Sequence, residues 1–280
     1  MKYLKHITLA LIILTTSCTD VIDVDLQTEA PKLVIEASID WEKGTEGNNQ
    51  TIKLSTSKPY FDTTSNTAVT GALVKVVNDL DLTEYVFTDQ NNGTYTTNNF
   101  VPVIGQSYSL EVVYGGETYL AQETLMPVVD IEEVNQSLEG GFNDEALEVN
   151  IYFQDPADEE NFYLLKFHEQ GDLLVDLEEE SDEFTNGNLL SDFYEKENDE
   201  DTNQKEFEAG DVVDIWLYGI SKQYHNYMRL FIEQYYSGED PFATAPVELR
   251  GNCVNITKPD NYAYGYFRLT QVVKTSYTFE

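Results

Sequence analysis

The first half of this chain contains a series of short segments in which apolar and polar residues alternate, separated by turn residues. Alternation places every second side chain on one face of a strand, and the Asn-Gly pair within residues 91–93 tolerates the positive φ of a tight hairpin. The expected strands are residues 32–39, 50–55, 71–77, 84–87, 94–96, 108–113 and 118–121. So many short strands over residues 32–127 indicate an immunoglobulin-like β-sandwich.

The second part of the chain, residues 128–280, is predicted to be a mainly-β domain with one amphipathic helix. Its expected strands are residues 147–153, 162–167, 212–218, 247–249 and 264–269. Apolar side chains recur at helical spacing from Tyr224 to Tyr235, which predicts a helix at about residues 221–237 that stops at Gly238. Residues 178–208 are acidic and poor in aliphatic side chains, which predicts a long mobile loop.

The N-terminal residues have the order of a secretory signal peptide. Lys2 and Lys5 precede the apolar residues 7–14, and small polar residues then lead to Cys18. At about 1.5 Å per residue, the apolar segment reaches only about 12 Å and is too short to span a bilayer. This order resembles the lipobox of bacterial lipoproteins, in which the cysteine is acylated and becomes the N-terminus. The resemblance predicts a signal peptide at residues 1–17, a lipid on Cys18 and a tether at residues 18–31.

Acidic residues follow the expected lipid anchor closely. Asp20, Asp23 and Asp25 come directly after Cys18. Acidic residues at this place resemble the export signal that sends Bacteroidota lipoproteins to the outer face of the outer membrane. The alternative is a tether that is merely polar. The resemblance implies a lipid-anchored protein of the outer membrane that faces the cell exterior.

The charge balance excludes one class of partner. The chain has 16 Lys and Arg residues against 51 Asp and Glu residues, and its net charge is −35 at pH 7. Nucleic-acid binders need basic faces, so nucleic acid is not an expected partner. With Cys18 acylated, Cys253 has no second cysteine to pair with and is expected to pack as a small apolar side chain.

Catalytic signatures are absent from the sequence. After the leader the chain has only His168 and His225, which fall on different expected elements, and both the HExxH and the GxSxG patterns are missing. His225 is expected on the surface of the helix. We therefore expect no enzyme activity.

One acidic loop offers candidate metal ligands. Asp155, Asp158 and Glu160 lie close together in the sequence and carry the carboxylate oxygens that Ca²⁺ prefers. The spacing is not that of an EF-hand loop, and an ordinary solvated loop is the alternative. No other cofactor is expected.

Three tyrosines form a candidate ligand surface. Tyr262, Tyr264 and Tyr266 alternate along an expected strand, so they share one of its faces. Such a face suits stacking on a sugar or a flat partner. Packing of the same face on the apolar stripe of the helix is the alternative.

Several motifs together resemble one family. CTDVIDVDL follows the lipobox, and PKLVIEASI, KLSTSKPYFD, VTGALVKV, NNGTY, GQSYSLEV, RGNCVN and GYFRL continue the likeness over most of the chain. These motifs are similar to a Bacteroidota lipoprotein family catalogued as domain of unknown function 4249. The resemblance implies a surface lipoprotein whose gene usually accompanies that of a TonB-dependent outer-membrane receptor. It carries over no catalytic residue.

These observations favour one function and leave two others open. The favoured function is an accessory subunit of a TonB-dependent import system that captures a ligand or docks on the barrel, with edge strands and sandwich loops doing the recognition. The first alternative is a structural or adhesin-like surface protein with no transport role. The second is an enzyme acting on extracellular polymer, which requires acids that converge in a deep cleft.

Overall fold

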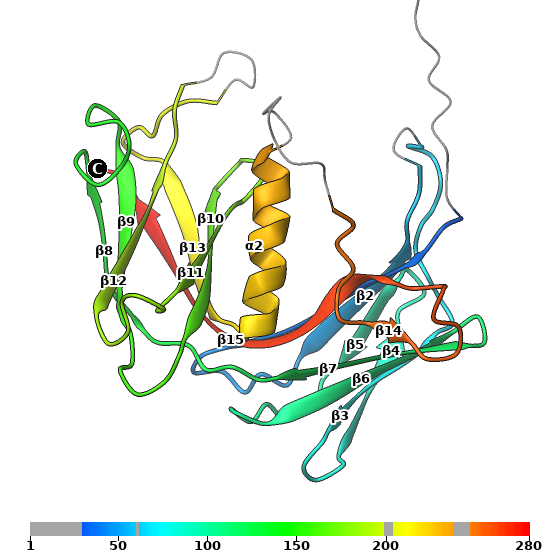
Figure 1. Ribbon diagram of the computed structural model, residues 1–280. Coiled ribbons are helices and arrows are strands. Elements are labelled where there is room, and N and C mark those ends of the chain that lie inside the picture. The colour runs from blue at the N-terminus through cyan, green and yellow to red at the C-terminus, as the bar shows by residue number, and fades with distance from the viewer. Residues whose placement is uncertain (1–29, 60–61, 199–203, 238–246) are drawn as a thin grey trace, which may run out of the picture. The chain divides into compact units, whose positions relative to one another are not determined.

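The computed structural model describes residues 30–59, 62–198, 204–237 and 247–280 (Figure 1). The expected signal peptide, the anchor Cys18 and the tether as far as residue 29 lie outside the described residues. Within the described part of the chain, no helix is both long and apolar enough to cross a membrane.

Seven strands build the N-terminal half, close to where the alternating segments predict them. They are β1 (Leu33–Glu42), β2 (Gln50–Thr56), β3 (Leu73–Asn78), β4 (Glu84–Asp89), β5 (Thr94–Thr97), β6 (Ser107–Tyr114) and β7 (Glu117–Thr124). Strand β4 pairs with β5 on one side and β3 on the other, so the chain passes between the two layers at this point. The layers enclose a core that includes the fully buried Ile35, Tyr95 and Tyr108. The expected β-sandwich is confirmed.

The C-terminal half has three layers. Its strands are β8 (Ile131–Ser137), β9 (Glu148–Gln154), β10 (Phe162–Glu169), β11 (Asp176–Ser181), β12 (Leu189–Glu195), β13 (Val212–Gly219), β14 (Val254–Asn255) and β15 (Tyr264–Thr278). A three-stranded sheet, in the order β12-β9-β8, packs on a larger sheet that contains β10 and β13. The core between the two sheets includes Ile151, Leu165 and Ile215. Strand β14 belongs to the N-terminal half in space, because it pairs with β7. The protein is mainly β, as expected.

Strand β15 joins the two halves (Figure 1). Its first part pairs parallel with β1, from Tyr264 beside Val34 to Val272 beside Glu42. Its second part pairs antiparallel with β13 as far as Thr278. The result is a twelve-stranded sheet in the order β11-β10-β13-β15-β1-β2-β5-β4-β3-β6-β7-β14. Pro31–Glu280 therefore form one compact unit with separate hydrophobic cores, and the core of the N-terminal half is completed by a strand from the end of the chain.

The helix α2 (Lys222–Ser237) lies where its apolar stripe predicts it. Ser221 begins the helix, because its hydroxyl oxygen accepts a hydrogen bond from the Tyr224 amide at 3.1 Å. The buried Tyr224 and Met228 pack on the outer face of the sheet with Tyr218. Phe231 and Tyr235, on later turns of the same stripe, are 41% and 57% exposed. The stripe is therefore covered only toward the start of the helix.

Two of the expected local structures are wrong. Residues 178–208 do not form one long loop, because they contain most of β11 and all of β12, which pair with β10 and β9. Pairing with an existing strand supplies the backbone hydrogen bonds that an acidic segment would not retain alone, so tertiary context overrides propensity. Residues 247–249 form no strand, and the nearby strand is β14.

Candidate functional site

The three tyrosines predicted as a ligand surface lie in two environments. Tyr262 and Tyr264 meet edge to face, with ring centroids 5.4 Å apart, and both stay partly exposed. Tyr266 is buried, and its ring centroid lies 4.8 Å from those of Tyr224 and Tyr227 on the helix. Packing on the helix stripe therefore accounts for Tyr266, and the three side chains do not form one surface.

The two exposed tyrosines belong to a local network of ring contacts, hydrogen bonds and an ion pair within the chain. The Tyr262 ring lies between the Lys32 ammonium, at 4.4 Å, and the Arg250 guanidinium, at 3.8 Å. Glu248 pairs with Arg250 at 2.6 Å and accepts a hydrogen bond from the Tyr264 hydroxyl at 3.1 Å. Hydrogen bonds from Arg250 above all lower the pKa of Glu248 to about 2. The Glu248 and Arg250 charges in this network are therefore already paired within the chain.

The three candidate calcium ligands are not brought together. Asp155 is buried and accepts hydrogen bonds from the Tyr163 hydroxyl at 2.7 Å and the Gly187 amide at 2.9 Å. Glu160 instead forms an ion pair with Lys222 at 2.7 Å, and Asp158 is exposed. Across the described residues, no group of three or more His, Cys, Asp or Glu side chains could hold a metal ion. Asp155 therefore fixes the loop that follows β9.

Cys253 and His225, two further side chains of reactive type, are buried. Cys253 is a free thiol packed in the N-terminal core, and burial raises its pKa to about 12, so little thiolate forms at neutral pH. His225 is buried rather than on the helix surface, because its ring packs on Phe162 and its Nε2 contacts Glu179 of β11. The helical position alone did not reveal that this face of α2 meets the sheet.

An apolar groove lies between β11 and the exposed end of α2. It has a volume of about 260 Å³ and is lined by Leu173, Leu174, Val175, Leu177, Phe231, Ile232, Tyr235 and Tyr236. Leu173 is 99% exposed and Leu174 is 69% exposed. Apolar side chains gathered in one exposed place are typical of interaction sites, whereas scattered ones need no explanation. This apolar groove is the first part of the candidate site.

Carboxylates occupy the inward face of β11, on the other side of the same strand. Glu178 is paired with Leu165 and Glu180 with Tyr163, and both partners belong to the core between the two sheets. Directly paired residues share a face of the sheet, so both glutamates point toward the interior. A strand whose inward positions are glutamates cannot close this edge of the sandwich with apolar contacts.

Strand β12 places a further carboxylate opposite them. Asp192 is paired with Ile151, a core residue of β9, and therefore also points inward. It lines a pocket of about 250 Å³ together with Glu178, Asp176 and Tyr194. We call Asp176, Glu178, Glu180 and Asp192 the carboxylate cluster.

The carboxylate cluster has raised pKa values. Burial above all, followed by the neighbouring carboxylates, raises the pKa values of Glu178 and Glu180 to about 7. Burial also raises the pKa of Asp192 to about 6 and raises that of Asp176. None of the ion pairs found among the described residues includes Glu178, Glu180 or Asp192. The cluster therefore concentrates negative charge without a cation from the described part of the chain.

Contacts with α2 connect the groove to the cluster. The Tyr236 hydroxyl donates a hydrogen bond to Asp176, the first residue of β11. Leu177, the next residue, packs on the helix side with the groove. Strand β11 thus has an apolar groove on one face and the carboxylate cluster on the other.

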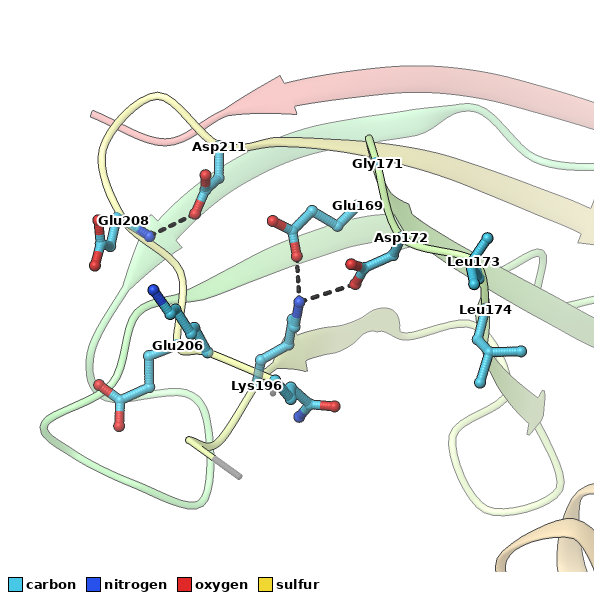
Figure 2. A pocket seen from close by; sticks show the side chains of 11 residues that line it. Glu169, Gly171, Asp172, Leu173, Leu174, Lys196, Glu206, Glu208 and Asp211 are labelled. Atoms are coloured by element: carbon cyan, nitrogen blue, oxygen red, sulfur yellow. Dashed lines mark hydrogen bonds and ion pairs between the residues drawn. The ribbon is translucent and has the colours of Figure 1, made fainter. Parts of the chain in front are cut away.

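A third pocket lies beside the segment that leads into the groove. It has a volume of about 520 Å³, and Figure 2 shows Lys196 pointing between Glu169 and Asp172 inside it. The Lys196 ammonium contacts Glu169 and lies 2.9 Å from Asp172. Burial opposes the charged form of Lys196, but these hydrogen bonds outweigh it and raise its pKa. Lys196 is therefore already paired with two carboxylates, and Lys205, Leu173 and Leu174 also line this pocket.

Neither the groove nor the cluster was predicted, because both depend on the strand β11, whereas a loop was expected from residue 178 on. The segment LLVDLEEES, residues 173–181, carried one usable signal, namely four aliphatic side chains placed directly before the acidic run. The inward direction of Glu178 and Glu180 could not be read from it, since this depends on the register with β10.

The likeness to solved structures is limited. The chain is 8% identical to a cytokine receptor complex over 69% of its own length and 86% of that chain, with a TM-score of 0.26. It is 9% identical to a two-domain fibronectin type-III segment of chicken tenascin, with 68% and 91% covered and a TM-score of 0.22. For the BSP domain of a biofilm associated protein the identity is 10%, the covered shares are 68% and 26%, and the TM-score is 0.24.

The sequence itself is more informative. No curated protein matches it. Residues 19–276, which include both halves of the fold, match the model of one family. The chain therefore belongs to the family described as domain of unknown function (DUF4249).

Proposed function

We propose that this protein is a lipid-anchored protein of the outer-membrane surface that works by docking, as an accessory subunit of a TonB-dependent import system. The observation that carries the proposal is the exposed apolar groove beside β11, which adjoins the carboxylate cluster. Exposed apolar side chains with charged side chains beside them are typical of a surface that another protein covers. The leader with Cys18 supports the location.

The proposal assigns no reaction to the protein. In the described residues, Cys253 and His225 are buried, and the carboxylate cluster lies beside a pocket of about 250 Å³. Ligand capture or docking of a partner uses such a surface without any catalytic group. We therefore propose a binding role, with no cofactor.

The test is to purify the natively expressed protein from detergent-solubilised membranes and to identify what accompanies it by mass spectrometry. We expect a TonB-dependent barrel in stoichiometric amount and an acylated N-terminus at Cys18. The matched control is Cys18→Ala, which we expect to leave the membrane fraction. A lipidated protein that elutes alone would contradict the subunit role and favour the structural or adhesin-like alternative.

A further inference from the structure

Strand β11 is a free edge of the twelve-stranded sheet. It is the first strand in the sheet order and pairs with β10, and no second strand lies beside it in the described residues. In an antiparallel pair, alternate residues direct their N–H and C=O groups away from the partner. These groups form a template for a further strand unless something covers them.

The two faces of β11 would present different side chains to a strand that lies beside it. Leu177 and Val175 point into the apolar groove, whereas Glu178 and Glu180 point toward Asp192 in the carboxylate cluster. Successive side chains of a strand point to opposite faces. A strand lying beside β11 would therefore place one residue against apolar side chains and the next against carboxylates.

We infer that the free edge of β11 binds an extended segment of a partner protein in which apolar and basic side chains alternate. The segment pairs with Leu177–Ser181 by strand addition, in which main-chain hydrogen bonds provide affinity and alternate side chains provide specificity. This inference rests on the proposed docking function, and it specifies the partner by its chemistry.

The basic half of the pattern follows from unpaired charge. Asp192 Oδ2 is buried and has no hydrogen-bond partner among the described residues. By contrast, Glu169 and Asp172 nearby share Lys196. Lys or Arg residues of the partner would supply the missing cations, and complementary charge of this kind also excludes acidic partners.

The apolar half of the pattern follows from the helix. Phe231 and Tyr235 continue the stripe of α2 beyond the part that the sheet covers. At the other end, the Tyr236 hydroxyl is bonded to Asp176, so the pairing begins after that residue. An apolar side chain opposite Leu177 would enter the groove and extend the packing of the helix.

The first experiment uses a synthetic peptide of about eight residues in which Lys and Val alternate, a length that matches an ordinary strand. Its control has the same composition with the lysines and valines in two separate blocks. Binding to the intact protein is measured by fluorescence anisotropy at pH 7.5. We expect the alternating peptide to bind at least about tenfold more tightly, since only it can satisfy both faces at once. Equal binding of the two peptides, or no binding of either, would overturn the inference.

The second experiment locates the binding site with matched variants. Glu178→Lys should weaken binding of the alternating peptide by about tenfold or more, while Glu132→Lys on β8, an exposed position on the edge strand of the other sheet, should not. Leu173→Ser should weaken binding, whereas Leu80→Ser, an exposed leucine of the other half, should not. Circular dichroism shows whether each variant is folded. Equal effects within each pair would mean that β11 is not the site.

The pH dependence gives a readout that a structural role would not produce. The cluster is faced by Tyr194, Glu195 and Glu197, which line the same pocket, and by Tyr236 of α2, which bonds Asp176. On the other face of β11, Glu179 contacts His225 of α2. Because Glu178 and Glu180 have pKa values of about 7, they lose their charge below neutral pH. The alternating peptide should therefore bind more weakly at pH 5 than at pH 8. Unchanged affinity across this interval would contradict the part assigned to the carboxylates.

A last measurement separates this inference from the proposed function. The purification from native membranes is repeated with Glu178→Lys and Glu132→Lys. Loss of the barrel from the first variant alone would support both statements. A barrel that stays with Glu178→Lys would overturn the inference about β11 and leave the subunit role standing.

Discussion

The two edge strands of the twelve-stranded sheet, β14 and β11, differ in length and in how their polar side chains are paired. At the end in the N-terminal half, β14 has only two residues, and Asn255 donates hydrogen bonds to Glu117 and to the Asn261 carbonyl, both at 2.7 Å. At the other end, β11 has six residues, of which Glu178 and Glu180 point inward without an ion-pair partner among the described residues. A short edge held by side chains resists further pairing, and an edge with inward charges resists strands that bring no opposite charge. Only the second kind leaves a charge that a partner can neutralise.

This difference indicates that the β14 edge serves the stability of the fold and that the β11 edge serves recognition. At the β14 edge, Asn255 completes hydrogen bonds within the chain itself. The C-terminal half places four carboxylates where apolar side chains would stabilise it more. Residues that cost stability without serving the fold are expected at functional sites.

The largest effect is expected at the strand that both halves share. Gly265 has φ +91°, and an added Cβ would overlap the Ile35 carbonyl group, so Gly265→Ala should lower the free energy of unfolding by about 4 kcal/mol or more. Because β15 pairs with both β1 and β13, both halves should lose stability together. Trp41 and Trp216 are the only tryptophans and lie in β1 and β13. Urea unfolding followed by fluorescence in the Trp41→Phe and Trp216→Phe backgrounds should give the same midpoint. Separate midpoints would show two independent halves.

A smaller effect is expected from the core next to the carboxylate cluster. Leu165 is fully buried and paired with Glu178, so Leu165→Ala should cost about 3 kcal/mol through lost burial and the cavity left behind. The matched change Leu173→Ala, at a side chain that is 99% exposed, should change stability by no more than about 0.5 kcal/mol. Urea unfolding of both variants measures the difference. A large cost for Leu173→Ala would mean that the groove belongs to the core.

The next largest effect on stability is expected at β14, the edge strand that contains Asn255. Asn255 is 1% exposed, and its side-chain oxygen also accepts hydrogen bonds from the amides of Thr257, at 3.0 Å, and Lys258, at 2.8 Å. Asn255→Ala leaves these groups without their partner and should cost about 2 kcal/mol. Thermal unfolding measures the loss, and amide exchange should become faster along β7 but not along β10. Unchanged exchange along β7 would contradict the role of Asn255 in closing this edge.

The smallest effect should have the opposite sign. The folded pKa of Glu178 is raised from 4.5 to about 7, so its charged form destabilises the folded protein above pH 7, and stability returns as the pH falls toward 4.5. Since the side chain is partly exposed and screened by solvent, Glu178→Gln should stabilise the protein by about 1 kcal/mol at pH 8 and by less at pH 5. Thermal unfolding over this pH range checks the sign. The exposed Glu132→Gln is the control, and an equal gain there would assign the effect to net charge.

The success of the sequence predictions follows the range of the interactions involved. Alternation located β1 to β7, and helical spacing located α2, because each pattern is written within a few neighbouring residues. The candidate sites fared differently. Asp155, Asp158 and Glu160 are adjacent in sequence but turn to different partners, namely Tyr163, solvent and Lys222. The strand β11 was missed because its acidic sequence has low strand propensity and pairs only with an edge already formed by β10.

The mainly-β class, the position of the helix, the acidic charge and the family can be read from the sequence, since each depends on composition, local period or motif. That β15 pairs with strands of both halves is visible only in the folded protein, because its pairing with β1 joins residues more than two hundred positions apart. The tertiary structure also decides which way Glu178 and Glu180 face, since a shift of one residue in the β10–β11 register would exchange the apolar groove and the carboxylate cluster.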